Sequence, residues 1–502
     1  MRFLRFAAVA LVGSVVLAAP AAAQVTDEQL AADIDAFISQ LMALNVTPGL
    51  AVAVVKGSEP VLIKGYGFAD VERNRPVTTT TGFYIASVTK TFTALTIKLM
   101  EERGTWKLSD PVSRYLPQLQ LGAGLSPDSI TLLQLITHTH GIENSGPIVA
   151  RTAFSGEHNN AQLMQLFREH KASGSGRNFR YTNVGFNLAG LIIDEVTRSS
   201  WKQALQAEIL KPLGMKNTSA FVSRFDSAQL AMPYAATGDG SFRRLHYAKG
   251  DGNMHAAGGL ISTAEDMAKY LEAQLNGGVL DGKRIFPARV IAATQSKVVV
   301  LPESDRPDRQ IAQGLGWQFY RHNGEEALVH GGGFSAFVTM VALVPAHKIG
   351  VAVMVNESKT GGGAGEFIAE YVIDRILNKP GYEQKHAQGM KNVENNVARR
   401  RAAIAEDAAR RAARPQTLPH PLSAYVGVYE HPLTGTLVWE QRGDKLHARW
   451  GLLQATAEVF DHATNKLRVE MEPGTGDVVE FKMTDGKATS VIFDRREYVR
   501  KN

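Results

Sequence analysis

The sequence contains no cysteine in 502 residues, and this absence removes several classes of site. It excludes disulfide bonds, thiolate metal sites, a cysteine nucleophile and a lipidated N-terminal cysteine. Charge is also sparse: charged residues make up 21% of the chain and the net charge is only +6, which does not indicate a nucleic-acid partner. Beyond Ala19 no segment offers 18 uninterrupted apolar residues, so we expect no stable membrane insertion of the mature chain.

The one long apolar run lies at the N-terminus and has the form of a secretory signal. Arg2 and Arg5 give it a basic start, residues 6–19 are apolar, and residues 21–23 form an A-x-A cleavage site. The run is short and ends in small residues, which favours a signal peptide over a transmembrane anchor. We therefore expect a signal peptide at residues 1–23 and a periplasmic or secreted protein, a location that suits an exported chain without disulfides.

Hydrophobic periodicity predicts a large first domain at residues 24–380, in a chain too long for one core. Strands are predicted at both ends of this domain, at 50–55, 61–66, 327–331, 336–344 and 349–355. A mainly helical stretch lies between them, and a last helix follows at about 366–377. Short connections among the late strands imply antiparallel pairing. The predicted fold class is α+β: an antiparallel sheet flanked by helices, with an all-helical insertion.

The composition changes twice after Pro380. Residues 381–418 are polar and rich in Ala and Arg, which predicts a solvent-exposed helical linker. A membrane-surface helix is the alternative, but its apolar stripe is thin, which favours the linker. Residues 419–502 carry short alternating runs separated by turn signals, which predicts a small C-terminal antiparallel β-barrel.

Ser87 and Lys90 stand at the start of a predicted helix whose apolar residues recur from Phe92 to Met100. Ser87 occupies the place of an N-cap, and Lys90 lies one turn further on the same face. The positive field of a helix N-terminus favours the neutral form of a lysine, and a neutral lysine beside a serine hydroxyl can act as a base. The alternative is an ordinary helix start.

Two later stretches carry residues that could complete such a site. In the first, Tyr181 and Asn183 point the same way if the chain is extended there. A tyrosine that loses its proton to a cationic neighbourhood can serve as a general base, and an amide can hold a substrate carbonyl; the alternative is a packed Tyr with Asn183 as an N-cap. In the second, His330 precedes three glycines on a predicted strand, which indicates a substrate-facing edge.

His138 and His140 stand two residues apart and could suggest a metal site. No carboxylate or third histidine stands near them at a standard spacing, so we expect no metal and no cofactor.

The set Ser87-x-x-Lys90, Tyr181-x-Asn183 and His330-Gly331-Gly332, in this order, resembles the serine β-lactamase/penicillin-binding-protein-like superfamily. The resemblance is to its class C β-lactamase branch, with D-alanyl-D-alanine carboxypeptidases, D-aminopeptidases and esterases. Supporting stretches are 108–112, 130–139, 212–218 and 256–263. The C-terminal part looks like the lipocalin-like β-barrel that is often appended to such hydrolases.

The resemblance implies a role for each residue of the set. Ser87 attacks a carbonyl and forms an acyl-enzyme, and Lys90 and Tyr181 move the protons, in an order that the sequence leaves open. Asn183 orients the acyl-side amide of the substrate. His330, Gly331 and Gly332 are expected to bind the substrate. His330 would either hydrogen-bond with Tyr181 or hold a carboxylate of the substrate. The backbone N–H groups of Ser87 and Gly333 form the oxyanion hole.

The third motif departs from the class C β-lactamases, which have Lys-Thr-Gly where this chain has His330-Gly331-Gly332. Histidine is only partly charged near neutral pH and anchors an anionic substrate less firmly than lysine. We therefore expect a secreted serine hydrolase that cleaves amide or ester bonds of small substrates, above all peptides, D-residue peptides included. A carboxylesterase or weak β-lactamase is the alternative within enzymes, and an acylating sensor without turnover is the alternative of another class.

Overall fold

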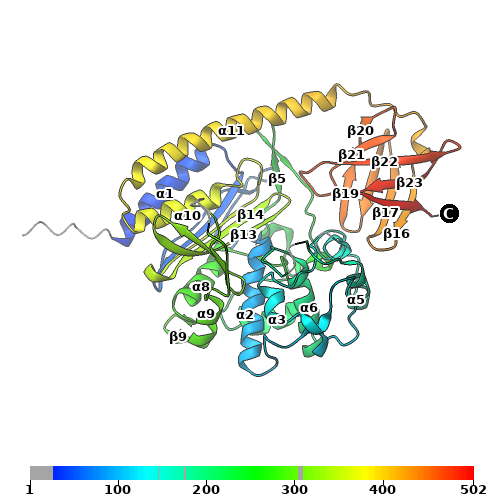
Figure 1. The fold of residues 1–502 in the computed structure, drawn as a ribbon. Coiled ribbons are helices and arrows are strands. Elements are labelled where there is room, and N and C mark those ends of the chain that lie inside the picture. Colours follow the sequence, from blue (N-terminus) through cyan, green and yellow to red (C-terminus); the bar gives the residue numbers. More distant parts are fainter. Residues whose placement is uncertain (1–25, 145, 175–176, 304–308, 502) are drawn as a thin grey trace, which may run out of the picture.

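The computed structural model describes residues 26–144, 146–174, 177–303 and 309–501, so the predicted signal peptide lies outside the described residues. A large α/β body and a smaller β-barrel lie side by side, and one long helix runs along the large body and ends beside the barrel (Figure 1). The helices are α1 (Asp27–Ala43), α2 (Thr89–Glu102), α3 (Leu132–Ile136), α4 (Pro147–Val149), α5 (Asn160–Leu166), α6 (Val184–Thr197), α7 (Trp201–Leu205), α8 (Ala264–Leu275), α9 (Ala288–Thr294), α10 (Ala364–Ile376) and α11 (Tyr382–Ala412). Within these described residues, no helix is long and apolar enough to cross a membrane.

The large body is built on an antiparallel sheet whose first and last strands are neighbours. In spatial order its strands are β10 (Val299–Val300), β11 (Ala312–Gln313), β12 (Gln318–His322), β13 (Glu325–Phe334), β14 (Phe337–Val344), β15 (Ile349–Val355), β1 (Gly49–Lys56), β2 (Glu59–Asp70) and β3 (Arg75–Pro76). The pairing of β1 with β15, from Leu50 opposite Val355 to Lys56 opposite Ile349, confirms that the two ends of this domain share one sheet. The predicted fold class is thereby confirmed.

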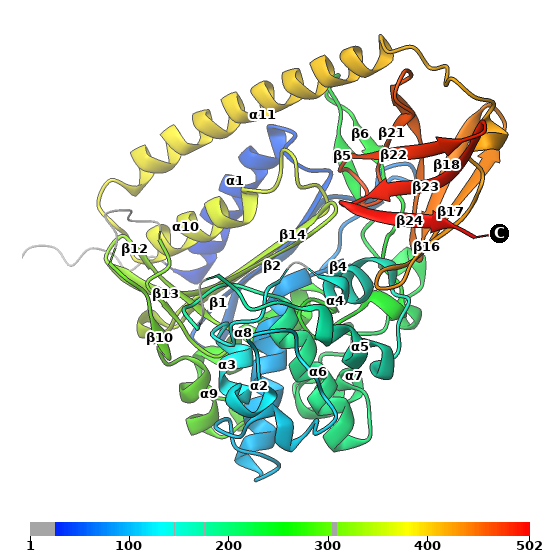
Figure 2. The same ribbon diagram turned by 45° about the vertical axis from the view of Figure 1, so that its right-hand side comes forward.

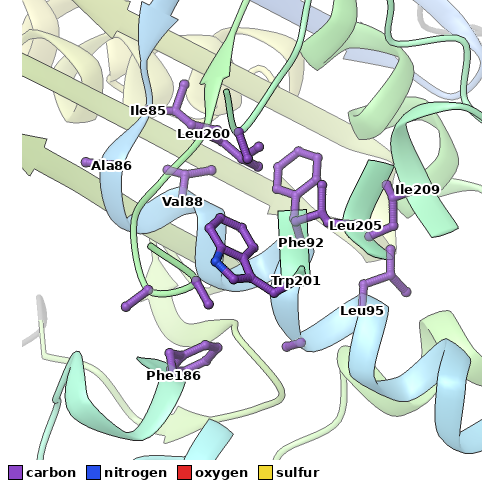
Figure 3. Packing of buried hydrophobic residues seen from close by; sticks show 14 of the residues in the cluster. Ile85, Ala86, Val88, Phe92, Leu95, Phe186, Trp201, Leu205, Ile209 and Leu260 are labelled. Carbon is purple, nitrogen blue, oxygen red and sulfur yellow. The ribbon is translucent and has the colours of Figure 1, made fainter. Parts of the chain in front are cut away.

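The sheet is covered on both faces, which explains why β1 reads as one continuous apolar run. Leu50, Val52 and Val54 belong to a core shared with α1 and α10. Ala51 and Ala53 face the opposite core, which includes α2, α6 and α8. In that second core, Phe92 and Leu95 of α2 are buried among side chains of the helical insertion (Figure 3). Burial on nearly all sides holds α2 rigidly, and the candidate site is built on its first turn.

Three short ladders complete the large body. They are β4 (Phe83–Tyr84) with β7 (Ile261–Ser262), β5 (Tyr234–Ala236) with β6 (Phe242–Arg244), and β8 (Val279–Leu280) with β9 (Lys283–Arg284). The ladder of β4 with β7 joins the chain just before Ser87 to the stretch that follows Ala257.

The C-terminal part is a nearly closed antiparallel barrel, as predicted. In spatial order its strands are β19 (Leu453–Thr456), β18 (Lys445–Trp450), β17 (Gly435–Arg442), β16 (Gly427–His431), β24 (Arg496–Arg500), β23 (Lys487–Phe493), β22 (Asp477–Thr484), β21 (Lys466–Val469) and β20 (Glu458–Asp461). The two edge strands, β19 and β20, follow one another in the chain. Trp439, Phe481 and Tyr498 fill the interior, where they are almost fully buried.

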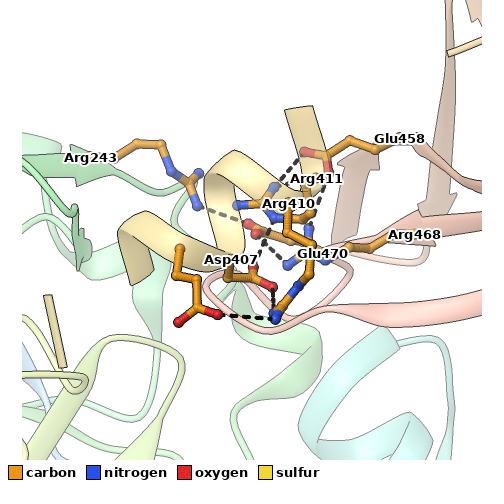
Figure 4. A network of polar contacts seen from close by, with 8 residues as sticks. Arg243, Asp407, Arg410, Arg411, Glu458, Arg468 and Glu470 are labelled. Carbon is orange, nitrogen blue, oxygen red and sulfur yellow. Dashed lines mark hydrogen bonds and ion pairs between the residues drawn. The ribbon is translucent and has the colours of Figure 1, made fainter. Parts of the chain in front are cut away.

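Helix α11 covers most of the predicted linker, and most of its residues are exposed, as the sequence predicted. His386, Val397 and Arg401 on one side of it are buried against the large body. Near its C-terminal end, Arg411 donates to Glu458 of the barrel at 2.9 Å, and Arg243 of β6 pairs with Glu470 at 3.0 Å (Figure 4). The domain boundaries stay predictions, but hydrogen bonds and ion pairs connect the large body, α11 and the barrel.

Candidate active site

Ser87 lies in a 3-10 turn, Ala86–Val88, that runs directly into α2. The expected N-cap role is wrong: Val88 is the cap residue of α2 and no side chain caps it. Ala86 adopts φ 45°, a conformation that is uncommon for a non-glycine residue, and its carbonyl accepts a 2.7 Å hydrogen bond from Thr89 Oγ1. The Ser87 hydroxyl is thus not used for capping and faces the side chain of Lys90.

Lys90 is fully buried and its amine meets three neutral oxygens. Lys90 Nζ lies 3.1 Å from Ser87 Oγ, 2.8 Å from Asn183 Oδ1 and 2.6 Å from the carbonyl oxygen of Ala257. Burial holds the pKa of Lys90 well below its ordinary value of 10.5. A neutral amine has two N–H groups and one lone pair. The N–H groups can donate hydrogen bonds to Asn183 Oδ1 and to the carbonyl oxygen of Ala257. The lone pair is then directed at the Ser87 hydroxyl.

Asn183 stands at the N-cap position of α6 but its side chain does not cap that helix. Its amide oxygen is taken by Lys90, and Asn144 supplies the cap instead: Asn144 Oδ1 accepts from the backbone N–H of Asn183 at 2.6 Å. Because Asn144 binds the backbone at this point, the side chain of Asn183 can contact Lys90 in the candidate active site. Nothing in the sequence pointed to Asn144, which lies 39 residues away in the chain.

Tyr181 keeps its proton in this arrangement. Burial raises the pKa of Tyr181 to about 12, although a hydrogen bond with Ser87 acts in the opposite direction. Lys90 Nζ lies 4.8 Å from the centroid of the Tyr181 ring. In its neutral form this amine provides no positive charge that would favour loss of the Tyr181 proton. The raised pKa favours the protonated form of Tyr181, and its role as a general base stays a prediction.

His138 and His140, considered above as metal ligands, hold the loop that carries Tyr181 and Asn183. His138 Nδ1 accepts from the backbone N–H of Thr182 at 3.2 Å, and its ring lies 4.6 Å from that of Tyr181. His140 Nδ1 accepts from the N–H of Ile142, so its Nε2 carries the proton and donates to Thr182 Oγ1 at 2.8 Å. Both histidines are thus engaged with the backbone or with Thr182, which sequence reasoning missed.

The glycines of β13 lie directly against the turn that carries Ser87. A Cβ atom on Gly332 would lie 2.1 Å from the carbonyl oxygen of Ile85 and 3.1 Å from the Ser87 nitrogen, so only glycine fits there. Pairing of β13 with β12 ends at Val329, and the strand continues past it with a free edge. A Cβ atom on Gly331 or Gly333 would point to the opposite face of the strand, where the nearest atoms, of Met340 and Phe337, lie 4.0 Å away.

His330 is buried, with 1% of its surface exposed, and carries no charge near neutral pH. Its Nδ1 lies 2.7 Å from the carbonyl oxygen of Gly331, which can only accept, so Nδ1 bears the proton. Burial, and secondarily Lys90, lowers the pKa of His330 to about 3. Its ring centroid lies 6.1 Å from that of Tyr181. A neutral imidazole with an unprotonated Nε2 fits the role beside Tyr181 better than that of a carboxylate anchor.

The structure therefore brings all the sequence-predicted site residues together around Ser87. Lys90 and Gly332 contact the Ser87 turn directly, Tyr181 has a hydrogen bond with Ser87, and Asn183 is joined to it through Lys90. In residues 26–144, 146–174, 177–303 and 309–501, no group of three or more His, Asp or Glu could hold a metal ion. The arrangement can deprotonate a serine, protonate a leaving group and offer backbone N–H groups to an oxyanion.

Comparison with known proteins agrees with this geometry. The family model described as Beta-lactamase matches residues 34–372, more than half of the chain. A second model, a domain of unknown function called DUF3471, matches residues 411–501, which contain the barrel.

Curated relatives and solved structures cover different shares of the chain. Protein flp of Staphylococcus aureus (strain MW2) is 27% identical over 64% of this chain, which spans 62% of that relative's length. Unguisins hydrolase ungD' of Aspergillus campestris (strain IBT 28561) is 26% identical over 80% of this chain and 76% of its own. The octameric penicillin-binding protein homologue from Pyrococcus abyssi matches with a TM-score of 0.59 and 24% identity, over 93% of this chain and 99% of its own, which shows a shared fold.

Proposed function

We propose that this chain, which belongs to the beta-lactamase family, is a serine hydrolase that cleaves amide or ester bonds of small peptides through an acyl-enzyme on Ser87. The observation that carries the proposal is the position of Lys90. Its buried amine lies 3.1 Å from Ser87 Oγ and has only neutral oxygens as partners. An amine in this setting is a base that needs no prior deprotonation.

Acylation follows from the placement of the groups. Lys90 takes the proton of Ser87 as Oγ attacks the substrate carbonyl, and the backbone N–H groups of Ser87 and Gly333 bind the oxyanion. Each such donor is worth about 3–4 kcal/mol of barrier. Tyr181 donates its proton to the leaving nitrogen or oxygen, and the proton on Lys90 replaces it. In deacylation, water gives a proton to the same pair as it attacks the acyl carbonyl, and that proton passes to Ser87 Oγ as the bond to the acyl group breaks and the acid leaves.

The substrate class is inferred from the charge of the site. The pKa of His330 is lowered to about 3 and that of Lys90 lies well below 10.5, so neither side chain is favoured as a cation that could hold a carboxylate. This supports peptide and ester substrates over β-lactams, whose family enzymes carry a lysine at the third motif. D-residue peptides remain within the proposal. A carboxylesterase is the second candidate, favoured by the same absence of a cation.

We also propose that the protein is exported, because residues 1–23 have the form of a signal peptide. Fractionation of cells that express the full chain, with N-terminal sequencing of the product, tests this. A cytoplasmic product with an intact N-terminus would contradict it.

The function is tested with the purified mature chain and Ser87→Ala. Both are assayed against short nitrophenyl esters, D- and L-aminoacyl anilides, D-Ala-D-Ala peptides and a chromogenic cephalosporin. We expect turnover of a peptide or ester and an acyl adduct on Ser87 by mass spectrometry. Full activity in Ser87→Ala would disprove the mechanism, and the fastest turnover with the cephalosporin would overturn the substrate class. One stoichiometric burst without turnover would identify a sensor.

A further inference from the structure

A cavity of about 470 Å³ lies between the large body and the barrel. One wall comes from the segment around α4, with Val149 and Phe154, and from Arg180; the other comes from the barrel, with Trp450 and Phe493. Figure 2 shows the barrel strands standing over α4. A cavity of this volume is large enough for a group the size of one or two residues.

The cavity borders the candidate active site at two points. Arg180 lines it, and the next residue is Tyr181. Asn144 lines it as well, and its side chain holds the backbone of Asn183, the residue expected to orient the acyl side of the substrate. A group attached to the acyl side of a substrate at Ser87 would therefore extend toward the cavity.

The barrel wall is held in place by direct hydrogen bonds. Arg151 Nε donates to the carbonyl oxygen of Leu433 at 2.6 Å, and the N–H of Leu452 donates to the carbonyl oxygen of Ser155 at 3.0 Å. The N–H of Ser335, two residues beyond Gly333, donates to Glu472 at 3.2 Å. The barrel is thus fastened to the same segments that shape the site.

Three of the side chains that line the cavity are aromatic: Phe154, Trp450 and Phe493. The ring of Phe154 lies 5.6 Å from that of Phe334, which follows Gly333, and 6.4 Å from that of Trp450 in the barrel. Phe493 meets Trp450 edge to face at 5.4 Å. A continuous row of rings leads from the end of β13 into the barrel wall, and it offers contact area to a flat apolar group.

The charges around the cavity leave two arginines available. Three carboxyl groups, Glu472, Asp477 and Asp494, line the cavity together with three arginines, and of these arginines Arg496 pairs with Asp494. Arg180 and Arg495 are exposed and have no acidic partner among the described residues. Because no cation is available beside Ser87 itself, these are the nearest groups on the cavity wall that can bind a carboxylate.

We propose that this interdomain cavity is an acyl-side subsite for a peptide-like group that carries an aromatic side chain and a carboxylate, with the barrel supplying half of the walls. The proposal rests on the function proposed above and assigns a role to the barrel.

The test compares succinyl-phenylalanine 4-nitroanilide, in its D and L forms, with its succinyl methyl ester and with 4-nitrophenyl acetate, which is too small to reach the cavity. The variants are Arg180→Ala and Arg495→Ala. Matched controls are Arg177→Ala, an exposed arginine on the same loop that does not line the cavity, and Lys487→Ala on the outside of the barrel.

For each cavity variant we expect the ratio of kcat/KM on the succinyl substrate to kcat/KM on the acetate to fall at least tenfold, mainly through KM. The methyl ester should lose this sensitivity, and the controls should keep the wild-type ratio. An unchanged ratio, or wild-type enzyme that turns over the acetate but neither anilide, would overturn the subsite. Failure of the proposed function looks different, since wild-type enzyme would then not turn over even the acetate, or Ser87→Ala would turn it over fully.

Discussion

Lys90 and Asp374 are both ionisable side chains with no exposed surface, yet their surroundings favour opposite charge states. Asp374 of α10 accepts from His322 at 2.8 Å, from His386 at 2.9 Å and from Lys385 at 2.9 Å, and these bonds hold its pKa well below the ordinary value. Lys90 has no charged partner, and burial lowers its pKa. Asp374 is thus kept charged, whereas Lys90 is favoured neutral.

The comparison shows that hydrogen-bond and charge partners, and not burial alone, determine whether a buried ionisable group is charged. Asp374 lies on the buried side of α10, where its bonds with His322 of β12 and with Lys385 and His386 connect α11 to the sheet. Lys90 lies at the opposite core, where its charge would be unpaired. The first arrangement stabilises the fold, and the second prepares a base.

The largest effect is expected from Lys90→Arg, which keeps a cation at the site but cannot supply a neutral base. We expect kcat/KM to fall by about 10²–10⁴-fold, the usual contribution of a general base. Lys98→Arg on the same helix is the control and should retain activity. Substantial turnover by a folded Lys90→Arg enzyme would show that charge, and not basicity, is what the site requires.

Asp374→Asn should act on stability instead. Removal of one partner from a buried ion network costs about 3–5 kcal/mol, measured as the free energy of unfolding in urea at pH 7. Because the folded-state pKa of Asp374 is lowered, its stabilisation is complete above the unfolded-state value of about 3.9 and is lost as the pH falls below it. The difference between wild type and variant should therefore shrink on acidification. A difference that stays constant to pH 2 would contradict this account.

The pH dependence of kcat/KM sharpens the comparison further. Protonation of Lys90 should remove activity on the acid side, by about tenfold per pH unit below the pKa of Lys90. Tyr181, with a pKa of about 12, should keep its proton throughout, so we expect a flat alkaline plateau up to pH 10.5. A fall centred between pH 9 and 10 would mean that a protonated lysine is needed.

The fold and the central residues could be predicted because local patterns carry them. The apolar run of β1, the helical periodicity after Ser87 and the alternation in the barrel all survive in the structure. Contacts between distant segments could not be predicted in this way. The support of Asn183 by Asn144, the carbonyl of Ala257 at Lys90 and the packing of α11 depend on tertiary placement that no short motif encodes.

The smallest effect is expected from Asn144→Ala, which removes the cap of α6. A lost cap costs about 1 kcal/mol, and we expect a comparable, roughly fivefold, loss in kcat/KM as Asn183 loosens. Asn144→Asp keeps the acceptor and should behave nearly as wild type. Equal loss in both variants would assign the effect to something other than the cap.

The central claim, that Lys90 is neutral in the resting enzyme, is tested most directly by NMR titration of the lysine side chains labelled with ¹³C at Cε. Burial also lowers the pKa of Lys249, to about 7, so the Lys249→Met and Lys90→Arg variants are measured alongside to assign the signals. We predict that the resonance missing in Lys90→Arg titrates well below 10.5. Titration of that resonance near 10.5 would contradict the account.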